Sequence, residues 1–138
     1  MRLVQDSTWA ALTIWMEARG QPFEGKVAVA EVIRNRTRMC FHSNGTVPDT
    51  CLRPYQFSCW NTKDPNRLKA AVIEDSALEM RACIEAWKKS GEAERLLPLE
   101  AVFYLNEATV MELAGKLPDW AREDRKLAIV GDHTFYRA

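Results

Sequence analysis

One carboxylic acid near the start of the chain lies among apolar residues. Glu17 follows the apolar stretch Thr8 to Met16 and is flanked by Met16 and Ala18. Apolar surroundings disfavour the charged form of a carboxyl group and keep it protonated closer to neutral pH. A protonated acid can give its proton to a poor leaving group, such as the oxygen that bridges two sugars. The alternative is a structural carboxylate at the helix end, paired with Arg19 or another cation, and both interpretations fit the pattern.

The segment Gln56 to Trp60 combines polar and aromatic side chains in a way that suits sugar binding. Gln56 and Ser58 supply an amide and a hydroxyl, and Phe57 and Trp60 supply aromatic faces. Amides bind acetamido groups, whereas aromatic faces stack on sugar rings. We therefore expect this segment to line a substrate cleft, with core packing as an equally good explanation for the two rings.

Further candidates lie in the last third of the chain. We expect Tyr104 and Asn106 to extend the cleft. Phe135 and Tyr136 alternate on a predicted strand, so that one faces the core and the other the cleft, where Tyr136 would contact substrate. His133 begins the same strand, and a hydrogen-bonded structural role is favoured over a second acid or base.

Three of the four cysteines, Cys40, Cys51 and Cys59, lie in one region without a close Cys-x-x-Cys pair. Together with His42 they have the residue types of a zinc site but not its spacing, so no metal is expected. A disulfide from Cys51 to Cys40 or to Cys59 is expected if the protein works outside a reducing compartment. Cys83 then remains a free thiol in the core.

The spacing of apolar residues predicts the helices that position these side chains. In the first helix apolar residues lie nearly all round, which is typical of a buried helix, and Asp6 or Ser7 is its cap. The second begins behind Pro22, and the third begins with a capping box of Ser76 and Glu79. The predicted helices run from Ser7 to about Gly20, from Phe23 to Arg38 and from Ser76 to Gly91.

The remaining segments predict a loop and a small β element. Between Met39 and Pro65 the periodicity disappears, and we expect a long functional loop with a small hairpin at Asn44-Gly45. The later elements are an apolar run at Ala101 to Leu105, a helix from Ala108 to Ala114 and a β-hairpin from Leu127 to Tyr136 that turns at Gly131-Asp132. The predicted fold class is mainly α with a small β-hairpin, in a single domain over residues 1–138.

Composition limits the partners of the chain. The 19 basic and 19 acidic residues give a formal net charge of zero, so no overall field steers the protein onto nucleic acid or anionic lipid. No apolar run approaches the roughly eighteen residues of a membrane span, and the stretch Thr8 to Met16 lacks the cleavage site of a signal peptide. We expect a monomer with no membrane anchor and no signal peptide.

Several blocks of the sequence resemble the SleB family of cell wall hydrolases, which is named for the spore cortex-lytic enzyme. The family's landmarks recur in order at Ile14–Pro22, Glu24–Arg36, Gln56–Trp60, Phe103–Asn106, Pro118–Trp120 and Gly131–Tyr136. The resemblance implies a lysozyme-like, lytic transglycosylase-like domain that cleaves peptidoglycan, with Glu17 as the catalytic acid and no metal or cofactor. We also expect Arg19, in the same Glu-Ala-Arg-Gly block, to contact the substrate.

The implied mechanism needs only one acid. Glu17 protonates the bridging oxygen after N-acetylmuramic acid, and its carboxylate then takes the proton of that sugar's C6 hydroxyl to leave a 1,6-anhydro end. A hydrolytic muramidase with the same acid is the alternative, and it ordinarily needs a second carboxylate roughly 5 to 9.5 Å away. The acids available for that role are Glu24, Glu31, Glu107 and Asp132. The family commonly has a second glutamate where this chain has Gln21, for which we expect a structural or substrate-contacting role.

The chain also resembles the minimal catalytic domains of bacteriophage endolysins. This interpretation implies a role in host cell lysis, with the enzyme held in the host cytoplasm until a holin-type partner gives it access to periplasmic peptidoglycan. One rival of a different class is a non-catalytic module that binds peptidoglycan. Another is a wall-remodelling enzyme with the same chemistry and no role in lysis.

Overall fold

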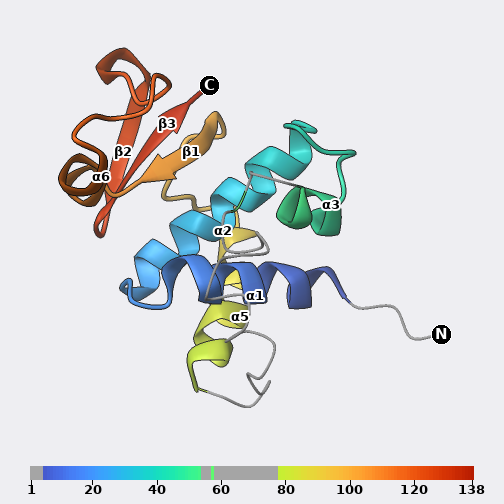
Figure 1. Cartoon of the computed structure of the whole chain (residues 1–138). Coiled ribbons are helices and arrows are strands. Elements are labelled where there is room, and N and C mark those ends of the chain that lie inside the picture. Colours follow the sequence, from blue (N-terminus) through green and yellow to red (C-terminus); the bar gives the residue numbers. More distant parts are fainter. Residues whose placement is uncertain (1–4, 54–56, 58–77) are drawn as a thin grey trace.

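The computed structural model describes residues 5–53, 57 and 78–138, which form a helical part and a small sheet (Figure 1). The helices are α1 (Asp6–Ala18), α2 (Phe23–Arg38), α3 (Val47–Leu52), α5 (Leu78–Ser90) and α6 (Glu107–Ala114), with a 3-10 turn, η2, at Glu123–Arg125. The strands β1 (Ala101–Leu105), β2 (Lys126–Val130) and β3 (His133–Arg137) form one antiparallel sheet in the order β1-β3-β2. None of the described helices has the length and apolar character needed to cross a membrane.

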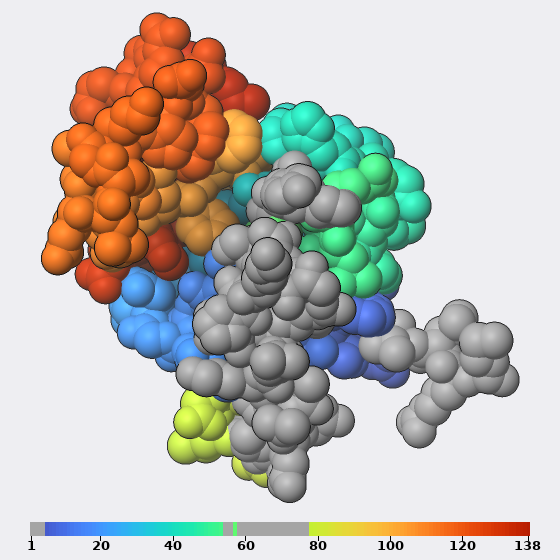
Figure 2. Space-filling view, viewed as in Figure 1, coloured from blue at the N-terminus to red at the C-terminus, as the bar shows by residue number. Residues whose placement is uncertain are grey.

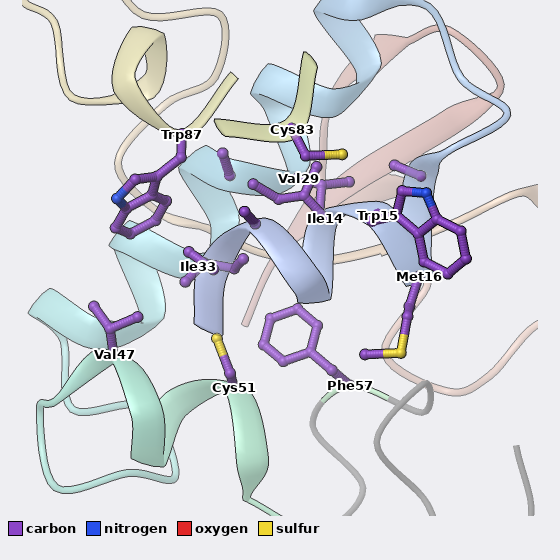
Figure 3. Packing of buried hydrophobic residues seen from close by; sticks show 14 of the residues in the cluster. Ile14, Trp15, Met16, Val29, Ile33, Val47, Cys51, Phe57, Cys83 and Trp87 are labelled. Atoms are coloured by element: carbon purple, nitrogen blue, oxygen red, sulfur yellow. The ribbon is translucent and has the colours of Figure 1, made fainter. Parts of the chain in front are cut away.

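The helical part is built around an apolar cluster to which α1, α2, α3 and α5 all contribute. Ile14 of α1, Ile33 of α2 and Cys83 of α5 are fully buried in it (Figure 3). α1 has buried residues on most of its circumference, as the sequence predicts for an internal helix. Burial of each large apolar side chain contributes about 1.5 to 3 kcal/mol, so this cluster is a main source of stability.

α2 separates the helical part from the sheet (Figure 1). Val29 and Ile33 belong to the main cluster, whereas Ala28 and Val32 pack with Phe135 of β3 in a second, smaller apolar cluster. In the space-filling view the sheet part occupies the upper left and the region of α3 the right of the face shown (Figure 2). α2 is therefore buried on two sides and positions both parts of the molecule.

Buried polar side chains of α2 hold the chain that leads into β1. Glu31 and Asn35 are each 1% exposed, and Arg36 is 4% exposed. An unpaired polar group at such depth is costly, and each of these side chains instead bonds to backbone atoms that need a partner. The bonds run from Leu96 N and Leu97 N to Glu31 (3.1 and 3.0 Å), from Asn35 Nδ2 to Ala101 O (2.8 Å) and from Arg36 Nε to Val102 O (2.6 Å).

The corner between α1 and α2 is fixed by a buried lysine. The Lys26 ammonium is almost fully buried and donates to Arg19 O at 3.2 Å and to Gln21 O. These carbonyls follow the last turn of α1, where a positive charge also complements the helix dipole. The corner therefore helps to set the orientation of the turn that carries Glu17.

The larger elements agree with the sequence predictions. α2 has the predicted bounds, and β2 and β3 turn at Gly131-Asp132, where Gly131 adopts a φ of 59°. α6 begins one residue earlier than predicted because the Asn106 side chain caps it, accepting Thr109 N at 3.0 Å. The mainly α fold with a small β element is confirmed, and β1 adds a third strand to the predicted hairpin.

The predicted start of the first helix is wrong in detail. Asp6 and Ser7 lie inside the first turn of α1, and Gln5 at the N-cap makes no side-chain cap bond. The acidic Asp6 in the first turn still complements the helix dipole. Ser76 of the predicted capping box lies outside the described residues, and α5 is described from Leu78.

The segment after α2 contains a short helix, α3, where a loop with a hairpin was expected. Asn44 Oδ1 accepts Thr46 N at 3.0 Å, and Thr46 Oγ1 accepts Asp49 N at 3.3 Å. Asn44-Gly45 therefore forms the turn that leads into a capped helix, and the hairpin prediction is wrong. Pro48 in the first turn of α3 fits this start, because proline lacks the N–H that has no partner there.

Candidate active site

Glu17 lies in the last turn of α1 and is half-buried. Its helix neighbours Ile14, Met16 and Ala18 are at most 4% exposed and belong to the main apolar cluster. The carboxyl group therefore lies at the edge of the core, with apolar protein on one side. This placement agrees with the position that the sequence predicts and suits a group that exchanges a proton with a bound substrate.

Arg36 of α2 brings a buried cation within electrostatic range of Glu17. Burial lowers the pKa of the Arg36 guanidinium, and the charges of Tyr104 and Glu17 oppose that shift. The guanidinium carbon lies 4.5 Å from the centre of the Phe57 ring, and Nε donates to the backbone of β1. Arg36 thus connects α1, α2, β1 and the described residue of the Gln56 to Trp60 segment.

Tyr104 approaches this group from the sheet. Its ring centre lies 5.1 Å from that of His133 and 5.6 Å from that of Phe135. His133 is 9% exposed, and its Nδ1 has no hydrogen-bond partner among the described residues, so the predicted hydrogen bond is not found at that atom. Burial lowers the pKa of His133, and the charge of Asp132 opposes it only in part, so the neutral imidazole is favoured.

Within the described part of the chain Arg19 forms no ion pair with Glu17, whereas Arg36 is another cation within electrostatic range, so the structural alternative to catalysis is excluded for Arg19 only. The Arg19 guanidinium instead lies over the indole of Trp15, with the guanidinium carbon 4.5 Å from the ring centre. Arg19 Nη1 and Trp15 Nε1 are both buried and make no hydrogen bond within the described part of the chain. Two unused donors therefore lie next to the turn that carries Glu17.

The predicted cleft segment is described only at Phe57. This ring is 1% exposed and points into the main apolar cluster together with Cys51 (Figure 3). Phe57 therefore packs in the core, which was the alternative to stacking on the substrate. Gln56, Ser58 and Trp60 lie outside the described residues, and their predicted substrate contacts stay predictions.

Asn106 and Tyr136 have structural contacts instead of joining the group around Glu17. Asn106 caps α6. Tyr136 is fully buried, as is Phe135, so neither ring of this pair faces an open cleft in the described structure. The Tyr136 hydroxyl donates to Glu107, and burial together with this carboxylate raises the pKa of Tyr136. Substrate contact by Asn106 or Tyr136 stays a prediction.

Three of the acids considered as a second catalytic carboxylate are bonded elsewhere. Glu31 accepts two backbone N–H groups and lies 3.5 Å from Arg95. Glu107 binds the Tyr136 hydroxyl and lies 3.5 Å from Lys126. The third, Asp132, accepts from the Gln21 amide at 3.3 Å. The fourth acid considered, Glu24, is exposed in the first turn of α2.

Gln21 has the structural role expected for it. Its Nε2 donates to Asp132 Oδ2, and its Oε1 accepts Asp132 N at 3.1 Å, so the side chain ties the α1–α2 corner to the β2–β3 turn. The approach is close, because a Cβ added to Gly131 would lie 2.7 Å from Gln21 Oε1. The glutamine amide can donate and accept at once, which a carboxylate cannot do.

The cysteines that the structure describes are free thiols. Cys40 is exposed, and Cys51 and Cys83 are buried, so the disulfide expected at Cys51 is absent; Cys59 lies outside the described residues. Burial raises the pKa of the Cys51 thiol to about 11 and has the same effect on Cys83, as expected for core thiols. Within the described ranges no three His, Cys, Asp or Glu side chains are grouped as metal ligands would be.

The fold is shared with two solved catalytic domains. The chain matches the catalytic domain of the germination-specific lytic transglycosylase SleB from Bacillus anthracis with a TM-score of 0.63 and 23% identity, covering 98% of this chain and 97% of the other. It matches the SleB catalytic domain of Bacillus cereus with a TM-score of 0.67 and 22% identity, covering 96% and 89%. The architecture is therefore that of the SleB catalytic domains, which confirms the lysozyme-like fold predicted from the sequence.

The chain belongs to the Cell Wall Hydrolase family, whose model matches residues 20–136. A search of curated proteins found no match. The family match begins after Glu17, so the role of that residue is argued from its position in the structure. Family membership supports cleavage of the bacterial cell wall as the activity.

Sequence reasoning missed Arg36 as a member of the site. The sequence held a signal for it, because Arg36 continues the pattern in which Val29, Val32 and Ile33 recur at steps of three and four residues along one face of the helix. A charged residue on an otherwise apolar helix face is either paired or bonded when the helix is buried. The identity of its partners depended on β1, which lies more than sixty residues further along the chain.

Proposed function

We propose that the protein cleaves the peptidoglycan glycan strand between N-acetylmuramic acid and N-acetylglucosamine as a lytic transglycosylase, with Glu17 as its acid and base. The observation that carries the proposal is the position of Glu17, half-buried at the end of a buried helix and within electrostatic range of Arg36, which also interacts with Tyr104. Among the four described acids considered as a second carboxylate, three are bonded to other groups, namely Glu31, Glu107 and Asp132, and this supports a reaction with one acid.

In the first half of the reaction, the protonated Glu17 carboxyl donates its proton to the oxygen that bridges the two sugars. The bond between that oxygen and C1 of N-acetylmuramic acid breaks, and the leaving sugar departs with a hydroxyl group. The apolar side chains around the last turn of α1 oppose ionisation of the carboxyl group, whereas Arg36 favours it, so this step requires that the apolar surroundings prevail before the substrate reacts.

In the second half, the Glu17 carboxylate accepts the proton of the C6 hydroxyl of N-acetylmuramic acid. The C6 oxygen then bonds to C1 and closes a 1,6-anhydro ring. Glu17 is thereby protonated again with the proton of the C6 hydroxyl, and no water is consumed. The Arg36 guanidinium stabilises the carboxylate in the interval between the two proton transfers.

The comparisons support the substrate and the type of chemistry. The Bacillus anthracis domain, which has the same fold over nearly its whole length, is a lytic transglycosylase. Membership of the Cell Wall Hydrolase family supports the wall polymer as substrate. Contacts of Arg19, Gln56, Ser58 and Trp60 with the glycan strand are part of the same proposal, and the two unused donors at Arg19 and Trp15 are available to it.

The test is the analysis of cleavage products. Purified peptidoglycan is digested with the parent protein, with Glu17→Gln and with Glu24→Gln, and the muramic acid ends are identified by mass spectrometry. We expect 1,6-anhydro ends from the parent and from Glu24→Gln, whose exposed carboxylate lies at the start of α2, and no products from Glu17→Gln. Equal product from Glu17→Gln contradicts the assignment of the acid.

Two rivals give different outcomes in the same experiment. A hydrolytic muramidase produces reducing muramic acid ends in place of anhydro ends. A non-catalytic binding module gives no products with any variant and leaves a sedimentation assay with insoluble peptidoglycan unchanged by Glu17→Gln. The experiment therefore separates the type of enzyme as well as the identity of the acid.

The biological setting predicted from the sequence stays a prediction. It includes a bacteriophage origin, storage in the host cytoplasm, release with a holin-type partner and action as a monomer. Expression of the chain in a bacterial host with and without a coexpressed holin tests it, and lysis is expected only in the presence of both proteins.

A further inference from the structure

A pocket lined by three arginines lies beside α2. It has a volume of about 270 Å³, and its lining includes Arg34 and Arg38 of α2 together with Arg95 from the segment before β1. Arg34 and Arg38 are each two residues from Arg36, and two residues correspond to about 200° around an α-helix. The two α2 arginines of the pocket therefore project from a different face of α2 than Arg36 does.

The positive charge of this pocket is not balanced by its own lining, which contains no acidic residue. Among the described residues, Arg34 and Arg38 form no ion pair and bond only to uncharged atoms. Arg34 donates to Ser90 Oγ at 2.7 Å and to Trp87 O at 2.8 Å, and Arg38 donates to Leu99 O at 2.9 Å.

Arg95 pairs with a buried carboxylate, Glu31, that is not part of the pocket lining. Arg95 lies 3.5 Å from Glu31, whose oxygens also accept two backbone N–H groups. Among the described residues, Glu31 is the one carboxylate within ion-pair distance of these three arginines, and it reaches Arg95 only. Burial and the nearby charge of Arg95 both lower the pKa of Arg34, as expected for a partly buried cation close to a like charge.

The guanidiniums are held in place before any ligand binds. Arg34 lies over the indole of Trp87, with its guanidinium carbon 3.7 Å from the ring centre, and Gly91 leaves room for it because a Cβ there would lie 3.0 Å from Arg34 Nη2. Arg95 donates to Asn35 Oδ1 at 2.7 Å. Groups fixed in this way lose little conformational freedom on binding, and the guanidinium fork matches the geometry of a carboxylate.

We infer that this pocket binds the free carboxylate at the end of a short peptide. The arginines supply N–H donors for the carboxylate, and Trp87, Val47 and Leu99 supply apolar walls for a small side chain beside it. Its volume is below that of pockets that enclose whole drug-sized ligands, which suits one or two terminal residues. The peptide stems of peptidoglycan carry such carboxylates, so the naming of this source rests on the proposed function.

The inference is tested by NMR titration of the 15N-labelled full chain. The probes are acetyl-D-alanyl-D-alanine, its C-terminal amide and inorganic phosphate. We expect the free carboxylate to shift the backbone signals of the lining residues and the amide to leave them unchanged. Arg38→Gln removes an exposed guanidinium and is expected to weaken binding about tenfold, in line with the loss of one charge-assisted hydrogen bond.

Arg122→Gln is the matched control. Arg122 is an exposed arginine that pairs with Asp124, and it does not belong to the pocket lining. The control variant is expected to bind the peptide as the parent does, and circular dichroism checks that both variants fold. Equal binding of the amide, unchanged binding by Arg38→Gln, or binding of phosphate alone overturns the inference.

Failure of this inference is distinguishable from failure of the proposed function. Glu17→Gln is expected to bind the peptide as well as the parent while it loses cleavage. If the parent protein cleaves peptidoglycan but binds no carboxylate, only the inference about the pocket is overturned. Carboxylate binding together with full cleavage by Glu17→Gln overturns the proposed function and leaves the carboxylate site standing.

Discussion

The helical part and the sheet are held in place by different kinds of interaction. α1, α2, α3 and α5 share a large apolar cluster, whereas the sheet meets α2 through a smaller one. The sheet is also fixed by hydrogen bonds between its backbone and the side chains of Asn35, Arg36 and Gln21. Apolar packing is non-directional, whereas hydrogen bonds depend strongly on geometry. Because the candidate site lies where the two parts meet, its geometry depends on those few bonds.

The largest effect is expected from Arg36→Lys, which weakens the central connection between the parts. Lysine keeps the charge but loses the Nε bond to Val102 O and the stacking on Phe57. A buried carbonyl without its partner costs about 2 kcal/mol, so we expect the free energy of unfolding to fall by that amount in urea titrations. We also expect cleavage of peptidoglycan to fall by at least about tenfold, because Tyr104 and Glu17 lose their fixed neighbour.

Arg122→Lys is the control for this comparison, since it makes the same chemical change at an exposed arginine of the sheet part. It is expected to change the free energy of unfolding by less than about 0.5 kcal/mol and to leave cleavage unchanged. Equal effects of the two substitutions contradict the idea that the bond between α2 and β1 fixes the site.

A smaller effect is expected from Gly131→Ala at the edge of the same junction. Gly131 has a φ of 59°, and an added Cβ would lie 2.7 Å from the Gln21 oxygen that accepts Asp132 N. We expect a loss of about 1 to 2 kcal/mol, measured as a lower midpoint of thermal unfolding. Gly20→Ala meets no atom within 4 Å and should change the midpoint much less. Equal midpoints for both variants contradict a strained, tightly packed turn.

The smallest effect concerns His133, which is buried within the sheet part. Burial holds its pKa below the ordinary value of 6.5, so the unfolded chain takes up a proton first as the pH falls. The contribution of His133 to stability is therefore complete above about pH 6.5 and is lost below it, by at most about 1.4 kcal/mol per pH unit. Urea titrations from pH 7.5 to 5 are expected to show a weaker decline for His133→Gln, and an identical decline contradicts the assignment.

The sequence predicts the elements whose signals are local. The bounds of α2 follow from Pro22 and the spacing of its apolar residues, and the hairpin follows from Gly131-Asp132 between two apolar runs. α3 was missed because six residues are too few for a helical period, and its start at Thr46 follows an Asn-Gly pair that favours hairpins. Short elements are decided by caps and tertiary packing more than by periodicity.

The candidate site was predictable only in part. Glu17 is conspicuous in the sequence as an acid inside an apolar helix, and Tyr104 was expected to extend the cleft; both lie within electrostatic range of Arg36, and their roles stay predictions. Arg36 connects them across the chain, and no spacing in the sequence indicates which backbone carbonyl it binds. One of Phe135 and Tyr136 was expected to face the cleft, yet both are buried, because β3 is the central strand and is covered on both faces; substrate contact by Tyr136 stays a prediction.

The most direct test of the central claim is digestion of peptidoglycan in water enriched in 18O, followed by mass spectrometry of the muramic acid ends. If Glu17 alone moves the proton and the C6 oxygen closes the ring, the parent protein produces anhydro ends without 18O. Under the same conditions Glu17→Gln produces none. Muramic acid ends that carry 18O, or products from Glu17→Gln at the parent rate, contradict the account.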